Sequence, residues 1–153
     1  MGIVVAAYPH SYLLNVYRKQ IDFPDLVRAV VDQRKRFSAT VTLVEDAASG
    51  VQLAQQLKDL GHYSVRTVKP EGDKVMRLYA QAAVIENGFV YVPREAHWLE
   101  EYLHELTTFP NSKHSDQVDS TSQALGWING VGRQPGILQF YRNEVERMRR
   151  GEK

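Results

Sequence analysis

The stretch ATVTLVEDAASGVQLAQQLKDLG, residues 39–61, decides the fold class. Its first part, Thr40–Val44, consists entirely of β-branched residues and one leucine, which predicts a buried strand. Three leucines then recur at helical spacing, at Leu53, Leu57 and Leu60. Because Gly61 follows them in the place of a C-terminal cap, a helix is predicted over Ala47–Leu60. A strand that leads directly into a helix is the repeating unit of an α/β sheet.

The same alternation continues on both sides of this stretch. Strands over residues 2–8 and Ser11–Gln20 enclose the turn PHS and predict a hairpin. Asp22 is a candidate N-cap for the helix that follows it, and Pro24 suits that helix's first turn. Further strands are predicted at 63–68 and 89–92, and further helices at 75–86, 96–106 and from about Ser115. We therefore expect an α/β fold with a mixed sheet flanked by helices.

The composition limits the classes of protein to consider. A chain of 153 residues is long enough for one domain with a core, which we place at 1–130, followed by a linker and basic tail at 131–153. The absence of cysteine excludes disulfides, thiolate zinc sites and cysteine nucleophiles, and fits a cytosolic protein. The net charge of +1 gives no overall attraction to nucleic acid, so any such role depends on a local patch. No apolar run approaches the roughly 20 residues of a membrane helix.

Two acids, Glu45 and Asp46, end the strand of the deciding stretch. Ligands of open α/β sheets gather at the carboxyl ends of the strands, so these carboxylates are candidates for a site. The alternative is that Asp46 merely caps the helix that begins after it.

A second pair of acids lies in FPNSKHSDQVDSTSQAL, residues 109–125. Asp116 and Asp119 are three residues apart, which puts both carboxylates on one face of a helix that starts near Ser115. Acids in a first turn also favour the helix dipole, so capping is again the alternative. Carboxylate clusters suit Mg²⁺ or Mn²⁺, and two such ions about 4 Å apart can drive phosphodiester hydrolysis.

Basic residues in VKPEGDKVMRLY, residues 68–79, are candidates for contacts with DNA phosphates. Lys69, Lys74 and Arg77 could form such a basic rim, and ordinary surface charge is the alternative. The segment lacks the glycine spacing and GK[ST] ending of a phosphate-binding loop, and the HExxH metalloprotease pattern is absent from the chain.

Four segments, taken in order, resemble one family: LLNVYRKQIDFPDL, VTLVEDAASGVQLAQQL, VKPEGDKVMRLYAQAAVIENGFVYVP and FPNSKHSDQVDSTSQAL. They resemble the C-terminal nuclease domain of phage terminase large subunits over most of residues 3–129. The resemblance implies an RNase H-like fold that cuts concatemeric double-stranded DNA during genome packaging, using two Mg²⁺ or Mn²⁺ ions. It also implies a phage- or prophage-encoded protein in the host cytoplasm. Its partners would be DNA and, through the full-length protein, the portal and small terminase, with no membrane.

The resemblance also implies roles for individual residues. Glu45 matches a metal ligand at the end of the central strand, whereas Asp46 matches a position that is often acidic. Asp116 matches a second metal ligand, and Asp119 matches an acid that binds metal or orients water. Lys74 and Arg77 match a basic pair near the DNA or the acidic site.

The chain departs from the family pattern in three respects that bear on activity. The family's first strand carries an aspartate that anchors both metals, and the chain is expected to begin after it. Ser115 also stands where the family has an acid, and the chain is expected to lack the family's ATPase motor domain. The expectation is therefore a two-metal endodeoxyribonuclease, with two alternatives: a catalytically silent DNA- or protein-binding module, or a resolvase-like nuclease that prefers branched DNA.

Overall fold

The computed structural model describes residues 2–7 and 10–132 of the chain. Its strands are β1 (Gly2–Ala7), β2 (Ser11–Tyr17), β3 (Thr42–Glu45), β4 (Val65–Val68) and β5 (Val90–Tyr91). Its helices are α1 (Phe23–Arg36), α2 (Ala48–Asp59), α3 (Lys74–Glu86), α4 (Leu99–Thr108), α5 (Asp116–Trp127) and the π-helix η1 (Ile128–Gly132). The predicted mixed α/β class is confirmed, and most of the predicted linker and tail lies outside the described residues.

The strands form two sheets rather than the single sheet expected. β1 and β2 make the predicted antiparallel hairpin, which runs from Gly2 opposite Tyr17 to Ala7 opposite Ser11, with a shift of register between Val4 and Val5. β5 joins β2 in parallel at two residues only, and β3 pairs with β4 in parallel. Within residues 2–7 and 10–132, no strand pairs with the outer edge of β1 or of β3.

A first hydrophobic core lies between the β3–β4 pair and two helices. Leu57 on α2 is fully buried, and it packs with Val44 of β3, Val65 of β4 and Val27 of α1. Leu53 and Leu57, two of the three leucines that predicted α2, are therefore buried, whereas Leu60 is the C-cap residue of α2 and is exposed. α1 begins as predicted, because the side chain of Asp22 accepts a hydrogen bond from the backbone N–H of Asp25 at 2.9 Å.

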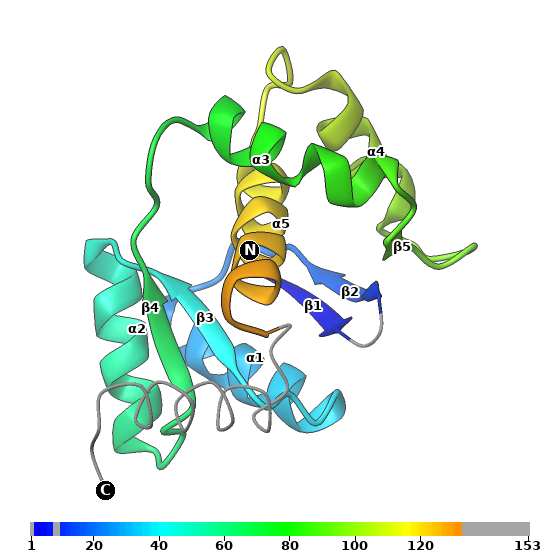
Figure 1. Ribbon diagram of the computed structural model, residues 1–153. Coiled ribbons are helices and arrows are strands. Elements are labelled where there is room, and N and C mark those ends of the chain that lie inside the picture. Colours follow the sequence, from blue (N-terminus) through cyan, green and yellow to red (C-terminus); the bar gives the residue numbers. More distant parts are fainter. Residues whose placement is uncertain (1, 8–9, 133–153) are drawn as a thin grey trace, which may run out of the picture.

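A second core lies between the β1–β2 hairpin and α4. Leu13 and Val16 of β2 pack against Trp98 and Tyr102, whose rings meet edge to face at 5.9 Å. Figure 1 shows α5 in the middle of the molecule, with the hairpin on one side of it and the β3–β4 pair on the other. α5 contacts β1 of one sheet, and its Gln123 hydrogen-bonds to Glu45 of β3 in the other, so this helix connects the two sheets.

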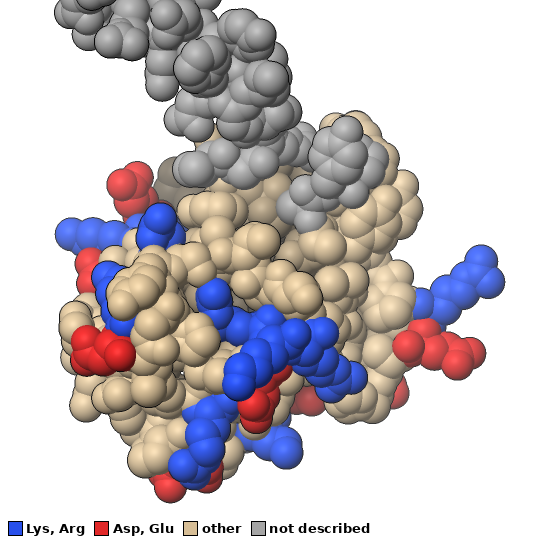
Figure 2. Space-filling view, turned by 90° about the horizontal axis from the view of Figure 1, so that it is seen from below, with Lys and Arg blue, Asp and Glu red and all other residues tan. Residues whose placement is uncertain are grey.

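None of the described helices has the length and hydropathy needed to cross a bilayer. On the face seen from below in Figure 2, lysine and arginine side chains lie close to aspartate and glutamate side chains. The charges of this face are therefore mixed, as the small net charge of the sequence suggests.

Candidate functional site

The first turn of α5 carries Asp116 and Asp119, but neither acid caps the helix. Ser115 occupies the N-cap position and makes no side-chain capping hydrogen bond. The backbone N–H of Gln117 instead donates to Glu105 Oε1 of α4 at 2.6 Å. Capping by either aspartate, the alternative raised from the sequence, is not what the structure shows.

Asp119 binds the two basic residues of α3. Its Oδ2 lies 2.5 Å from Lys74 Nζ, and its Oδ1 lies 2.7 Å from a terminal nitrogen of Arg77. Lys74 Nζ also donates to Ser115 Oγ at 2.8 Å. Both oxygens of Asp119 are thus engaged by cations, and the basic pair lies against the acidic end of α5.

The turn before α3 sets the position of this basic pair. Asp73 caps α3, because its Oδ1 accepts from the backbone N–H of Met76 at 2.8 Å. Gly72 adopts a φ of +69°, a left-handed conformation that favours glycine, and its carbonyl accepts from Arg77 at 2.8 Å. The segment EGDK therefore orients both Lys74 and Arg77 toward α5.

Glu45 lies at the carboxyl end of β3 and meets α5 through Gln123. The Gln123 side chain donates from Nε2 to Glu45 Oε2 at 2.8 Å, across 78 positions of sequence. Since Gln123 follows Asp119 by four residues and Asp116 by seven, all three lie on one face of α5. The structure therefore brings Glu45 to the face of α5 that carries both predicted acids.

Asp46, the neighbour of Glu45, is exposed and does not cap α2. The N-cap residue of that helix is Ala47, which has no side-chain capping hydrogen bond. The backbone N–H of Asp46 extends the β3–β4 ladder by donating to Val68 O at 2.8 Å. The capping role considered for Asp46 is therefore wrong.

Gly50 holds the end of β3 against the start of α2. A Cβ atom built on Gly50 would lie 2.0 Å from the carbonyl oxygen of Glu45, a distance that no side chain can accept. The first turn of α2 can approach Glu45 only because residue 50 is glycine. The sequence signal for this contact is a glycine in the first turn of a helix that directly follows a strand.

The oxygen donors of the site suit Mg²⁺ or Mn²⁺ in their chemistry, but they are not gathered into a complete set of ligands. Among the residues that the structure describes, no three histidines or carboxylates lie close enough together to hold a metal ion. Glu45 and Asp116 form no ion pair within this part of the chain, whereas Asp119 forms two. Of the three predicted ligands, Glu45 and Asp116 thus have carboxylates that pair with no cation of the described residues.

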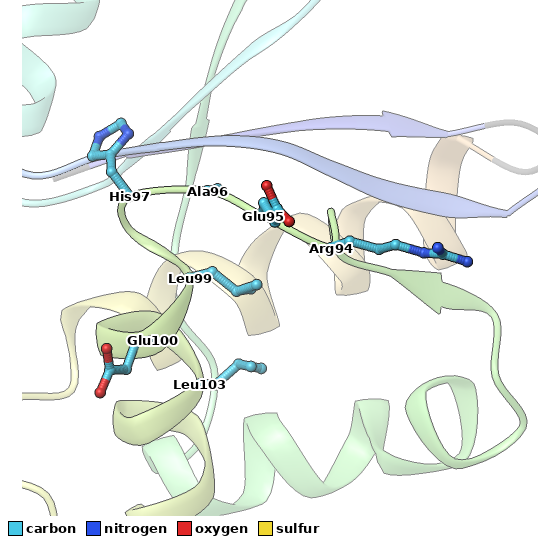
Figure 3. Close-up of a pocket in the computed structure, with 7 residues that line it drawn as sticks. All are labelled: Arg94, Glu95, Ala96, His97, Leu99, Glu100 and Leu103. Carbon is cyan, nitrogen blue, oxygen red and sulfur yellow. The ribbon is translucent and has the colours of Figure 1, made fainter.

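A separate open cavity of about 710 Å³ lies at the start of α4. It is lined by Arg94, Glu95, Ala96, His97, Leu99, Glu100 and Leu103. Figure 3 shows that the charged side chains of Arg94 and Glu100 point in different directions, so they do not converge on one ligand atom. None of the site residues predicted from the sequence lines this cavity.

Comparison with known proteins identifies the region that contains these acids. The sequence model described as the terminase RNaseH-like domain matches residues 1–126, which include β1 to β5 and nearly all of α5. No curated protein matches the sequence.

Proposed function

Because the chain belongs to the terminase RNaseH-like domain family, we propose that it is a metal-dependent endonuclease domain. Its substrate is concatemeric double-stranded phage or prophage DNA, which it cuts during genome packaging. The observation that carries the proposal is the hydrogen bond from Gln123 to Glu45, which joins the end of β3 to the acidic face of α5. In the full-length protein, the portal and small terminase are further partners, in the cytoplasm of the host.

Glu45 and Asp116 would hold the metal ions, since both are exposed carboxylates without an ion-pair partner in the described part of the chain. Bound Mg²⁺ or Mn²⁺ supplies an activated water and stabilises the leaving oxygen of the phosphodiester. Asp119 has a different role, because it already binds two cations. It orients Lys74 and Arg77, whose remaining donors can contact DNA phosphates.

The test is nicking of supercoiled plasmid in Mn²⁺ by wild type, Glu45→Gln and Asp116→Asn. We expect wild type to nick and each variant to lose most of that activity. Asp32→Asn, which changes an exposed acid of α1, is the matched control and should nick at the rate of wild type. Circular dichroism establishes that every variant is folded. Equal nicking by wild type, Glu45→Gln and Asp116→Asn would refute the assignment of the acids.

A second candidate function, a silent binding module, is favoured by the lack of a three-ligand group in the described residues. Such a module would bind double-stranded DNA with Lys74 and Arg77 but would not cut it. Tight binding in a gel-shift assay together with no nicking in Mn²⁺ or Mg²⁺ would support this candidate. A preference for branched over linear DNA would instead indicate a resolvase-like nuclease.

A further inference from the structure

The carboxylate that caps α5 belongs to a different helix and is deeply buried. Glu105 of α4 is 5% exposed, and its Oε1 accepts from the backbone N–H of Gln117 at 2.6 Å and of Val118 at 3.4 Å. Its Oε2 accepts from the side chain of Gln117 at 2.7 Å. A buried carboxylate is costly unless it is hydrogen-bonded, and three N–H groups meet this one.

Arg18, which follows β2, completes the surroundings of this carboxylate. One of its terminal nitrogens lies 3.7 Å from Glu105 Oε2 and also pairs with Glu101. The negative charge is thus placed between a cation and the N-terminus of a helix, and both stabilise it. The contact fixes α5 to α4 and to the β1–β2 hairpin at the same point.

The two amides that bind Glu105 Oε1 belong to residues next to the predicted acids. Gln117 follows Asp116 directly, and Val118 precedes Asp119 directly. Ser115, the residue that would ordinarily cap such a helix, uses its hydroxyl to accept from Lys74 instead. Glu105 therefore caps α5 in place of Ser115, and the hydroxyl of Ser115 is left to bind Lys74.

From these contacts we propose that Glu105 is a positioning residue for the candidate site. It fixes the first turn of α5 so that Asp116 and Asp119 face Glu45 and the basic pair, and it touches neither metal nor DNA itself. The proposal rests on the proposed function only in taking Asp116 and Asp119 as residues of a nuclease site. The orientation of α5 by Glu105 is independent of it.

The experiment compares Glu105→Ala and Glu105→Asp with wild type by two measurements that do not depend on DNA cleavage. The first is the NMR resonance of the Gln123 side-chain amide, which reports its hydrogen bond to Glu45. The second is the Mn²⁺ concentration at half-saturation, followed by water proton relaxation. In Glu105→Ala, we expect the Gln123 resonance to move toward that of a solvent-exposed amide and the Mn²⁺ half-saturation to rise about 10- to 100-fold. In Glu105→Asp, which keeps the charge, both effects should be smaller.

Tyr102→Phe is the matched control. It removes the other buried hydrogen bond between α4 and α5, in which Tyr102 Oη and Thr121 Oγ1 are 2.9 Å apart, and it leaves the Glu105 cap in place. A purely structural role for Glu105 predicts that both variants lower stability and that neither changes the Gln123 resonance or the Mn²⁺ half-saturation of the folded protein. That result would overturn the proposal.

An exchange of the pair keeps the proposal testable if Glu105→Ala does not fold. In the double variant E105Q/Q117E, the new amide at 105 can accept from the backbone N–H of residue 117 and donate to the new carboxylate at 117. We expect each single change to disturb the Gln123 resonance and the double variant to restore it. A folded double variant without restoration would refute the positioning role. If wild type binds no Mn²⁺, the proposed function fails, and the Gln123 resonance still decides the role of Glu105.

Discussion

The ion pair between Asp119 and Arg77 gives a prediction that separates the two acids of α5. Asp119→Asn keeps the size of the side chain and removes its charge. The pair is largely withdrawn from water, since the side chains of Asp119 and Arg77 are 14% and 16% exposed. Lys74, the other partner of Asp119, is 49% exposed. The Arg77 pair should therefore account for most of the loss of stability.

The expected loss of stability in Asp119→Asn follows from these exposed fractions. A pair with one exposed partner, such as that with Lys74, contributes about 0.2–1 kcal/mol. Breaking a fully buried pair costs about 3–5 kcal/mol, because the remaining charge is left without compensation. Arg77 keeps some exposure and its hydrogen bond to Gly72 O, so we expect Asp119→Asn to lower the free energy of unfolding by about 2–3 kcal/mol. The melting temperature should fall by about 4–10 °C.

The assay is urea unfolding followed by circular dichroism, with EDTA present to exclude metal effects. Asp116→Asn is the control, because this exposed acid has no ion pair among the described residues. It should lose less than about 1 kcal/mol, from the helix dipole alone. A double-mutant cycle with Arg77→Met isolates the pair. Equal losses in the two asparagine variants, or a coupling free energy below about 0.5 kcal/mol, would contradict the reading of Asp119 as the residue that holds α3 to α5.

Four further predictions follow from other parts of the structure. Leu57→Ala should lower the free energy of unfolding in urea by about 2–5 kcal/mol, since Leu57 is fully buried, and a loss below 1 kcal/mol would contradict that burial. Gly50→Ala should lower the free energy of unfolding by about 1–2 kcal/mol net and reduce nicking, because the new methyl group displaces Glu45. An unchanged melting temperature and unchanged nicking would count against the close approach of Gly50 to Glu45. Burial raises the pKa of Tyr102 above 10.0 in the folded protein. The neutral phenol therefore stabilises the folded state fully below pH 10, and this contribution is lost as the pH rises through the folded-state pKa. Urea unfolding above pH 10 should therefore show a steeper loss in wild type than in Tyr102→Phe, and parallel pH profiles would be inconsistent with this cause. No strand of residues 2–7 and 10–132 pairs with the outer edge of β1, so this edge should pair with a second copy, giving a mass by light scattering that rises with concentration. A constant monomer mass would argue against this pairing.

Local signals in the sequence were sufficient for most of the elements. Turn residues predicted the hairpin, and Asp22 was found as the N-cap of α1. The leucine spacing predicted α2 and the burial of Leu53 and Leu57, although Leu60 is exposed. These features depend on neighbours within a few residues, and periodicity and capping report such neighbours directly.

The remaining features depend on residues that are distant in sequence. The division into two sheets is set by which strands find partners, and hydrophobic periodicity carries no information on pairing. Glu105 was not considered from the sequence, because tertiary packing against α5 is what buries it. Asp116 and Asp119 were found because their spacing is local. The partner of Asp119 was foreseen only as a basic pair near the acidic site, and Gln123 was not considered at all.

The position of α5 has a consequence for synthesis of the chain. The β1–β2 hairpin with α1, and the β3–α2–β4 unit, are each made from contiguous sequence and can form as soon as they emerge from the ribosome. The hydrogen bond between Glu45 and α5 cannot form before Gln123 is translated, 78 residues later. A nascent chain therefore carries Glu45 for most of its synthesis without the helix that completes the candidate site. A chain released before α5 lacks Asp116, Asp119 and Gln123, so it cannot assemble the candidate site.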